Sequence, residues 1–393
     1  MLITMIIIGQ LCLSVPILLV RAKKAAIYLP LALFLLAIGI LAQGSMVSSL
    51  FPAWYAFYTA LAFPTLFLLC PSLWFYVEGL TSSTPWTLNK KQLHHYFLIW
   101  PALLVSVMIL LLPKDMHTAI FIEDVEVVTP LAITLYVSIL VVILLWLGQC
   151  TYTIFRIVQR LIAYRRELKS LFSNNEGREL NWMNWLLLVA ISTWLFFLAM
   201  VFSSNLFDNF LFNIRTEALL SLLLIWSLAH FGLQQKPGIT GYSDHAPINI
   251  PTQNDDAHIN KENEKILSTS KKYLRSALSK EQSHRIAEKI NAVMHEDKLY
   301  LDANLSLQKL ANHLVISPNY ISQTLNETLA INFFDFVNQW RIKDAKPKIL
   351  ANKNTVLDIA LEVGFNARSS FYKAFKQEVG KTPSEFRKHY MQH

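Results

Sequence analysis

Basic side chains are concentrated in the last part of the chain, where their charge could hold the phosphates of a nucleic acid. After Phe336 there are eleven lysine and arginine residues against five aspartate and glutamate residues. Such a segment fits a phosphate-binding surface, and it fits an ordinary solvated face equally well. The sequence contains no Gly-x-Ser-x-Gly, His-Glu-x-x-His or P-loop motif. We therefore expect binding chemistry, with no enzyme activity, no cofactor and no metal.

An internal repeat in the same region is the strongest signal. In each copy a short apolar pattern is followed, after a gap, by a second one. The first copy is Leu307-x-x-Leu310-Ala311 with Ile321-x-x-x-Leu325, and the second is Val356-x-x-Ile359-Ala360 with Phe371-x-x-x-Phe375. Apolar residues three or four apart lie on one face of a helix. Each copy therefore predicts a short helix, a tight turn and a second helix, the helix-turn-helix arrangement of many DNA-binding proteins.

Residue types at the ends of the predicted helices agree with these boundaries. Ser306 precedes the first helix, Ser317-Pro318 supplies an N-cap followed by a proline, and Thr355-x-x-Asp358 resembles a capping box. Gly364 lies in the turn of the second copy, where a positive φ is often required, and Gly380 ends the second recognition helix. The capping pattern thus supports both motifs.

A helical stretch over residues 333–350 is predicted between the two copies. Eighteen helical residues rise about 27 Å at 1.5 Å per residue. Successive major grooves on one face of a duplex are about 34 Å apart. A spacer of this length would let the two recognition helices enter successive grooves.

Several motifs then carry a resemblance to a known family. The second copy reads Ala360-Leu-Glu-Val-Gly364-Phe365, Phe371-Tyr-Lys-Ala-Phe375-Lys376 and Gly380-Lys-Thr-Pro383-Ser-Glu-Phe-Arg387, and the first contributes Leu310-Ala311 and Ile316-Ser-Pro-Asn-Tyr-Ile-Ser322. At these spacings, residues 305–390 resemble the DNA-binding domain of the AraC/XylS family of transcription regulators. By its hydropathy the whole chain is similar to the multi-spanning, membrane-bound branch of that family.

The resemblance implies which side chains read DNA. They are Asn319, Ser322 and Gln323 in the first recognition helix, with Asn326 one turn further on, and Arg368, Ser369, Tyr372 and Lys373 in the second, with Lys376 near a phosphate. Arginine and lysine can hydrogen-bond guanine, and asparagine and glutamine can hydrogen-bond adenine. The alternative for each is an exposed polar residue that reaches no base.

Two residues depart from the family pattern. Val315 occupies the turn position where the family usually has glycine, and a β-branched side chain is unfavourable there if φ must be positive. Pro347 falls inside the spacer helix, where proline removes a hydrogen bond and can kink the helix. We therefore expect the first turn and the groove-to-groove spacing to be the least regular parts of the domain.

The first part of the chain has the composition of a membrane domain. Hydrophobic residues make up 53% of the chain and charged residues 16%, against about 25% charged in soluble domains. A helix needs about 20 apolar residues to cross a bilayer, where only helices and closed barrels satisfy the backbone. Seven segments approach that length: 2–20, 26–43, 54–78, 96–113, 128–150, 183–203 and 213–232. The predicted fold is all-α, a seven-helix transmembrane bundle followed by a soluble helical domain with two helix-turn-helix motifs.

Basic residues in the short loops predict the orientation of these spans. One set of alternate loops carries eleven lysine and arginine residues, and the other carries only Lys114 and Arg215. Because the basic loops face the cytoplasm, the N-terminus is expected outside and the C-terminus inside the bacterial inner membrane. An odd number of spans agrees with this result. The first segment has no basic residues before its apolar run, so we expect a retained span rather than a signal peptide.

The sequence predicts four consecutive regions. Residues 1–233 form the transmembrane domain, and residues 234–262, rich in proline, glycine and polar residues, have the composition of a flexible linker. Residues 263–300 form a helical connector, with a helical pattern that returns near Ser283, and residues 301–393 form the DNA-binding domain.

The leading hypothesis is a one-component regulator that binds double-stranded promoter DNA in the major groove. Its N-terminal domain would contact membrane lipid and respond to an unknown small-molecule or membrane signal. The alternative is a membrane receptor whose helix-turn-helix domain docks a cytoplasmic protein, and the basic second recognition helix argues against it. An intramembrane enzyme or transporter would require polar residues at mid-span, which are scarce here. The sequence fits a monomer, and it also fits a homodimer joined through the spans or through residues 263–300.

Overall fold

The described part of the chain is mainly helical. The structure, a computed structural model, describes residues 2–123, 125, 127–175, 178–202, 214–235 and 278–391. Within these residues there is no β-strand, and one isolated antiparallel bridge joins Phe172 to Ser306. The all-α prediction is confirmed for this part of the chain.

The chain divides into two compact units. The first, called here the bundle unit, comprises Met1–Ala163 and Leu180–Ser243. The second, called the C-terminal unit, comprises Tyr164–Glu179 and Asp244–His393. The segment Tyr164–Glu179 therefore belongs to a different unit from the residues that flank it in sequence.

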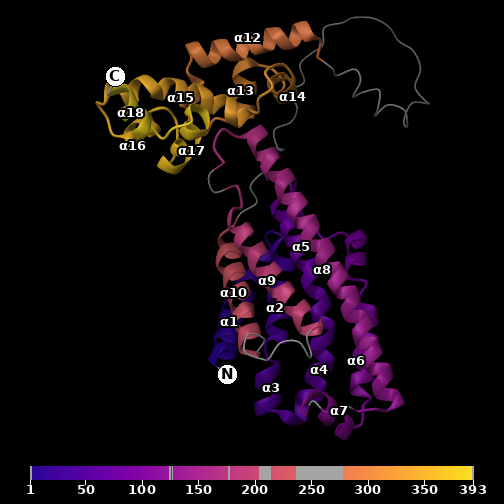
Figure 1. The fold of residues 1–393 in the computed structure, drawn as a ribbon. Helices are drawn as coiled ribbons and strands as arrows, with labels where there is room; N and C mark the ends of the chain where they lie inside the picture. Colours follow the sequence, from indigo (N-terminus) through magenta and orange to yellow (C-terminus); the bar gives the residue numbers. More distant parts are fainter. Residues whose placement is uncertain are drawn as a thin grey trace, which may run out of the picture. The chain divides into compact units, whose positions relative to one another are not determined.

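A helix occupies each of the seven apolar segments that the sequence predicted (Figure 1). The helices are α1 (Leu2–Ala22), α2 (Tyr28–Leu41), α4 (Tyr55–Thr65) with α5 (Leu69–Leu80), α6 (Ile99–Leu110), α8 (Pro130–Leu171), α9 (Trp182–Phe202) and α10 (Ile214–Gln234). Shorter elements connect them: α3 (Gly44–Leu50), η1 (Pro52–Trp54), η2 (Leu66–Leu68), η3 (Lys90–Tyr96) and α7 (Lys114–Phe121). Helix α1 packs against α2 and α10, α10 also packs against α9, and α4 packs against α6.

Fewer than seven of these helices meet a strict length and composition test for a membrane span. Among the described residues, four stretches pass it: α1, Pro52–Leu80, Gln92–Leu110 and α8. A fifth is added if α2 and α3, which are bent by 43° at a short break, are taken as one span. Trp182–Phe196 of α9 and Leu219–Gln234 of α10 are shorter apolar helices. The seven-span bundle therefore stays a prediction.

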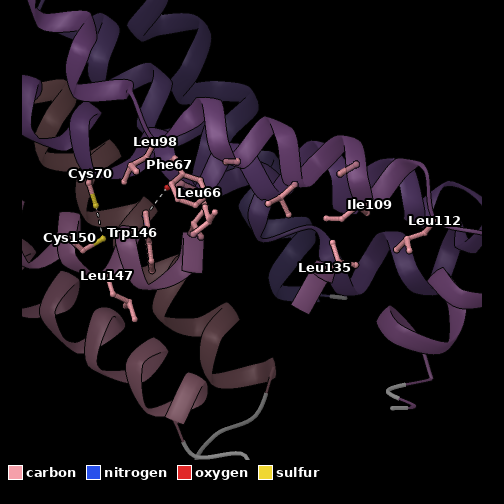
Figure 2. Packing of buried hydrophobic residues seen from close by; sticks show 14 residues of the cluster. Leu66, Phe67, Cys70, Leu98, Ile109, Leu112, Leu135, Trp146, Leu147 and Cys150 are labelled. Carbon is pink, nitrogen blue, oxygen red and sulfur yellow. Dashed lines mark hydrogen bonds between the residues drawn. The ribbon is translucent and has the colours of Figure 1, made fainter. Parts of the chain in front are cut away.

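An apolar core holds the middle of the bundle unit together (Figure 2). The indole Nε1 of Trp146 donates a hydrogen bond of 3.1 Å to the backbone oxygen of Leu66, at the start of the 3₁₀ turn η2 between α4 and α5. Nearby, the sulfur atoms of Cys70 and Cys150 lie 2.6 Å apart. Both cysteines are buried and serve as small apolar packing residues of this core.

Helix α8 is longer than the predicted span. The sequence predicted a span over 128–150 followed by a basic loop, but the helix continues without interruption to Leu171. Its 42 residues correspond to a length of about 63 Å. The helix persists because an apolar stripe continues at helical spacing beyond the predicted span. The buried residues of that stripe are Ile157, Leu161, Tyr164 and Leu168.

The C-terminal unit contains the two predicted helix-turn-helix motifs (Figure 1). Its elements are α12 (Lys280–Glu296), η4 (Leu299–Leu301), α13 (Leu307–Leu314), α14 (Pro318–Gln323), the π-helical turn η5 (Thr324–Thr328), α15 (Phe333–Ala351), α16 (Val356–Glu362), α17 (Arg368–Val379) and α18 (Pro383–Met391). The expected spacer helix over 333–350 is α15, which remains one helix through Pro347. Pro347 therefore does not break the helix.

The structure describes only part of the expected linker and connector. Residues 236–262 of the linker and residues 263–277 of the connector lie outside the described residues. The helical pattern predicted near Ser283 corresponds to α12. Ser279 caps this helix by accepting a hydrogen bond from the backbone nitrogen of Gln282, whose side chain bonds back to Ser279.

Candidate nucleic-acid interface

The two helix-turn-helix motifs close their turns with the same backbone hydrogen bonds. In the first motif the nitrogen of Ile316 donates to the oxygen of Ala311 at 3.0 Å. In the second motif the nitrogen of Phe365 donates to the oxygen of Ala360 at 2.9 Å. The internal repeat seen in the sequence is thus a repeat of turn geometry as well.

The turn residues that precede these bonds differ in side chain but share a left-handed conformation. Gly364 has a φ of +93°, and Val315 has a φ of +52°. The first turn therefore has a left-handed residue at the same place as the second turn, contrary to the irregularity expected there, and a β-branched residue adopts an unfavourable conformation. The Val315 side chain is 68% exposed, so no tight packing opposes it. At Gly364, by contrast, a Cβ atom would lie 2.6 Å from the backbone oxygen of Tyr300, so only glycine fits.

The helices of the domain begin in two different ways. Ser306, Asn332 and Thr355 each cap the supporting helix that follows by accepting a hydrogen bond from a backbone N–H. The two recognition helices, α14 and α17, begin at Ser317 and Ala367 without a side-chain capping bond. Ser317 was expected to cap α14 and does not, although Pro318 does take the first helical position. The open N–H groups of a helix start are donors that suit a phosphate.

The first recognition face consists of uncharged side chains with one acid beside them. Asn319 and Asn326 are exposed, whereas Ser322 and Gln323 are half-buried. The amide of Asn326 donates to the hydroxyl of Ser322 at 3.4 Å, one helical turn away. The amide of Gln323 donates to the carboxylate of Glu327 at 2.9 Å. The sequence did not point to Glu327 or to the π-helical turn that carries it.

The second recognition face is basic. Arg368, Ser369, Lys373 and Lys376 are exposed, and Tyr372 is half-buried. The guanidinium of Arg368 donates to the hydroxyl of Tyr372 at 3.0 Å and lies 4.9 Å from the centre of its ring. Burial alone would raise the pKa of Tyr372, but hydrogen bonds with Ser384 and Arg368 outweigh it and hold the pKa below the ordinary value. Arg368 is therefore positioned before any DNA is present.

An aromatic core positions α17 under this face. The ring of Phe371 lies 5.2 Å from that of Phe365 and 5.6 Å from that of Phe375, and Phe375 lies 5.4 Å from Phe386. Phe371 and Phe375 have no exposed surface. Because these rings anchor the inner side of α17, its outer side carries Arg368 and Lys373 toward solvent.

A buried arginine holds the parts of the C-terminal unit together. Arg341 of α15 is only 1% exposed, and its guanidinium donates to the backbone oxygens of Tyr300 and Asp302, both at 2.8 Å. Its central carbon also lies 5.3 Å from the ring centre of Phe365 in the second motif. Burial lowers the pKa of Arg341 to about 10, partly offset by the charge of Asp302, so it is cationic at neutral pH. The sequence did not indicate this role, because Arg341 resembles the other basic residues of the spacer helix α15.

A further partner of Arg341 comes from a distant segment. Its guanidinium also donates to the backbone oxygen of Ser173 at 3.3 Å and to the Ser173 hydroxyl at 3.2 Å. The backbone nitrogen and hydroxyl of Ser173 in turn donate to the oxygen of Leu305, at 3.2 and 2.6 Å. Leu171, the last residue of α8, packs against the apolar core of the first motif. The segment after α8 is therefore an integral part of the C-terminal unit, which the sequence did not indicate.

Comparisons with known proteins find similar sequences over the C-terminal region. Residues 310–389 match the family model described as a helix-turn-helix domain. The chain is 33% identical over 100 residues to an uncharacterised HTH-type transcriptional regulator of Staphylococcus aureus (strain COL), covering 25% of this chain and 13% of that protein. It is 32% identical over 94 residues to the HTH-type transcriptional regulator YijO of Escherichia coli (strain K12), covering 24% of this chain and 33% of that protein.

A similar stretch occurs in a solved structure, the C-terminal domain of the two-component response regulator yesN from Fusobacterium nucleatum. That match has 28% identity and a TM-score of 0.24, and it covers 26% of this chain and 98% of that one. The chain thus matches only a small part of the two curated relatives, 13% and 33% of their lengths. Residues 310–389 therefore carry a helix-turn-helix domain that is similar to part of these HTH-type transcriptional regulators.

Proposed function

We propose that this protein is a membrane-anchored one-component transcription regulator of the bacterial inner membrane. The apolar helices hold the chain in the bilayer with the N-terminus outside and respond to a signal. The C-terminal unit lies on the cytoplasmic side and binds promoter DNA with its two recognition helices. Membrane lipid, double-stranded DNA and an unidentified signal are then the partners, and a homodimer is compatible with this function.

The paired recognition faces support the DNA-binding part of the proposal. Both recognition helices lack side-chain caps, and both present residues of the types that read base edges. The second face adds the charges of Arg368, Lys373 and Lys376, which suit the phosphate backbone. Base specificity would come from both faces, and electrostatic affinity mainly from the second.

One observation carries the membrane-anchored part of the proposal. Helix α8 begins within the apolar bundle unit, and its last eight residues, Tyr164 to Leu171, belong to the C-terminal unit. Ser173, two residues beyond α8, is bound by the buried Arg341. A helix that begins among apolar neighbours and ends inside the DNA-binding unit supplies a direct physical connection between sensing and DNA binding.

The test is a selection of DNA by the intact protein. The full chain is reconstituted in lipid nanodiscs and incubated with fragmented genomic DNA of the source organism, and the retained fragments are sequenced. We expect a shared motif of two boxes about ten base pairs apart, the spacing of successive major grooves. A bare nanodisc is the control. No enrichment over that control would contradict the proposed function and favour the docking of a cytoplasmic protein.

The orientation is tested separately. A reporter enzyme that is active only in the cytoplasm, fused after His393, should be active, and the same reporter fused before Met1 should be inactive. The opposite pattern would contradict the proposed topology without affecting the DNA-binding result.

A further inference from the structure

We propose that the bundle unit binds an uncharged, mainly hydrocarbon molecule with one hydrogen-bond acceptor. The site is a cavity of about 420 Å³ that is lined by residues of α2, α4, α5, α8, α9 and α10. Small-molecule sites have volumes of about 300–1,000 Å³. One wall is visible in Figure 2, where Leu66, Cys70, Trp146 and Cys150 come together.

The lining determines the charge of the ligand. Among the described residues that surround the cavity there is no aspartate, glutamate, lysine, arginine or histidine. Aliphatic and aromatic side chains from every helix of the wall make up most of its surface, as with Phe34, Leu73 and Leu224. Burying an unpaired charge among such groups is strongly unfavourable. The ligand must therefore be neutral and largely apolar.

A buried indole supplies one polar contact. Two tryptophans line the cavity, and the Nε1 of Trp146 already donates to the oxygen of Leu66. The Nε1 of Trp194 is buried and has no hydrogen-bond partner among the described residues. Tyr58, another lining residue, already donates its hydroxyl to the oxygen of Ile40. The free donor of Trp194 thus calls for an acceptor on the ligand, such as the carbonyl of an ester, aldehyde or ketone.

The size of the cavity sets the size of the ligand. An apolar cavity of about 150 Å³ stays dry and holds one benzene molecule. A cavity of about 420 Å³ has room for a flexible chain of medium length. A free acyl ester and the acyl chain of a bilayer lipid share this chemistry, and the experiment separates them. The statement that this ligand is the regulatory signal rests on the proposed function. The binding itself does not depend on that function.

Bromine on the ligand makes binding measurable, because it quenches the fluorescence of tryptophan at short range. The full chain in nanodiscs is titrated with methyl 10-bromodecanoate and, in parallel, with 1-bromodecane, which lacks the carbonyl. We expect a saturable quenching component for both, with tighter binding of the ester. Trp194→Phe should weaken binding of the ester about fivefold and that of bromodecane less than twofold. Trp185→Phe, at an exposed position on the same helix, should change neither.

Two variants that fill the cavity from different helices test its location. Ala190→Phe on α9 and Ser221→Leu on α10 should each abolish the saturable component. Nanodiscs of lipid brominated on its acyl chains then identify the source of the ligand. If brominated lipid quenches the wild-type protein more than the filled variants, the occupant of the cavity is the acyl chain of a bilayer lipid. If it quenches the wild type and the filled variants equally, the occupant is a free molecule.

The absence of any saturable component in the wild-type protein would overturn the proposal, as would unchanged binding in both filled variants. The genomic DNA selection is carried out on the same preparation. Enrichment of DNA without saturable quenching would remove the ligand site and leave the proposed function standing. Saturable quenching without DNA enrichment would support the ligand site and contradict the proposed function.

Discussion

Arg341 and Ser173 are 168 residues apart in sequence, and two hydrogen bonds join the guanidinium of one to the backbone oxygen and hydroxyl of the other. The same guanidinium bonds the backbone oxygens of Tyr300 and Asp302. One cation therefore satisfies carbonyl groups of two segments, which are also joined by the hydrogen bonds of Ser173 to the oxygen of Leu305. The stability of the C-terminal unit should depend on it.

Replacing Arg341 with methionine should destabilise the C-terminal unit by about 3 kcal/mol, because several buried carbonyl groups lose their donor. Hydrogen exchange of the full chain, followed by mass spectrometry, should show faster exchange over residues 298–310 and 171–175. Arg285→Met is the matched control, since Arg285 is exposed and pairs only with Glu281, and it should cost less than about 0.5 kcal/mol. Equal exchange in Arg341→Met and the wild type would contradict the role given to this residue.

Ser173→Ala should loosen the segment after α8 by about 1–2 kcal/mol. The variant loses the hydroxyl that donates to Leu305 and accepts from Arg341, while the backbone contacts remain. Faster exchange should therefore be confined to the segment and to the residues around Leu305. Ser170→Ala removes an exposed hydroxyl that bonds only within α8, and it should have no measurable effect. A similar change in both variants would mean that the Ser173 contacts are not specific.

Opposite effects are expected at the two turn residues. Val315→Gly should stabilise the first motif by about 1 kcal/mol, because glycine adopts a positive φ without strain. Gly364→Ala should destabilise the second motif by more than about 2 kcal/mol, because the new Cβ would meet the oxygen of Tyr300. The measurement is again exchange over each motif in the full chain. Destabilisation by Val315→Gly would mean that Val315 contributes packing not evident from its exposure.

Glu327→Gln should strengthen DNA binding about twofold to fivefold, since it removes an acidic group beside the first recognition face and keeps an acceptor for Gln323. The gain should shrink as salt is raised. Glu288→Gln, an exposed acid on α12, is the control and should change affinity little. Weaker binding by Glu327→Gln would indicate that the carboxylate itself contacts the DNA, for example by accepting a hydrogen bond from cytosine.

The sequence predicted most of the C-terminal unit because its signals are local. The spacing of Leu310, Ile321, Ile359 and Phe371 determines one face of each helix, and the spacer predicted over 333–350 is Phe333–Ala351 in the structure. The caps of α13 and α16 were predicted for the same reason, as their hydrogen bonds lie within three residues. The positions of the apolar helices were also predicted from composition alone.

Features that depend on distant contacts were not predicted. Nothing in the polar sequence around Ser173 indicates that Arg341 will bind it, because the pairing exists only once the chain has folded. The continuation of α8 to Leu171 was hidden by its basic residues, which occupy the faces beside a buried apolar stripe. Conversely, Ser317 was predicted as a capping side chain and makes no such bond, and Pro347 does not interrupt its helix.

The most direct test of the proposed function is DNA binding by variants of the basic recognition face. The affinity of the full chain in nanodiscs for its selected duplex is measured by fluorescence anisotropy. Arg368→Ala and Lys373→Ala should each weaken it by about fivefold to a hundredfold, and Arg368→Ala should also relax the preference for one base pair. Lys289→Ala, an exposed lysine on α12, should change affinity less than twofold. If both Arg368→Ala and Lys373→Ala bound the duplex as tightly as the wild type, α17 would not be the recognition helix.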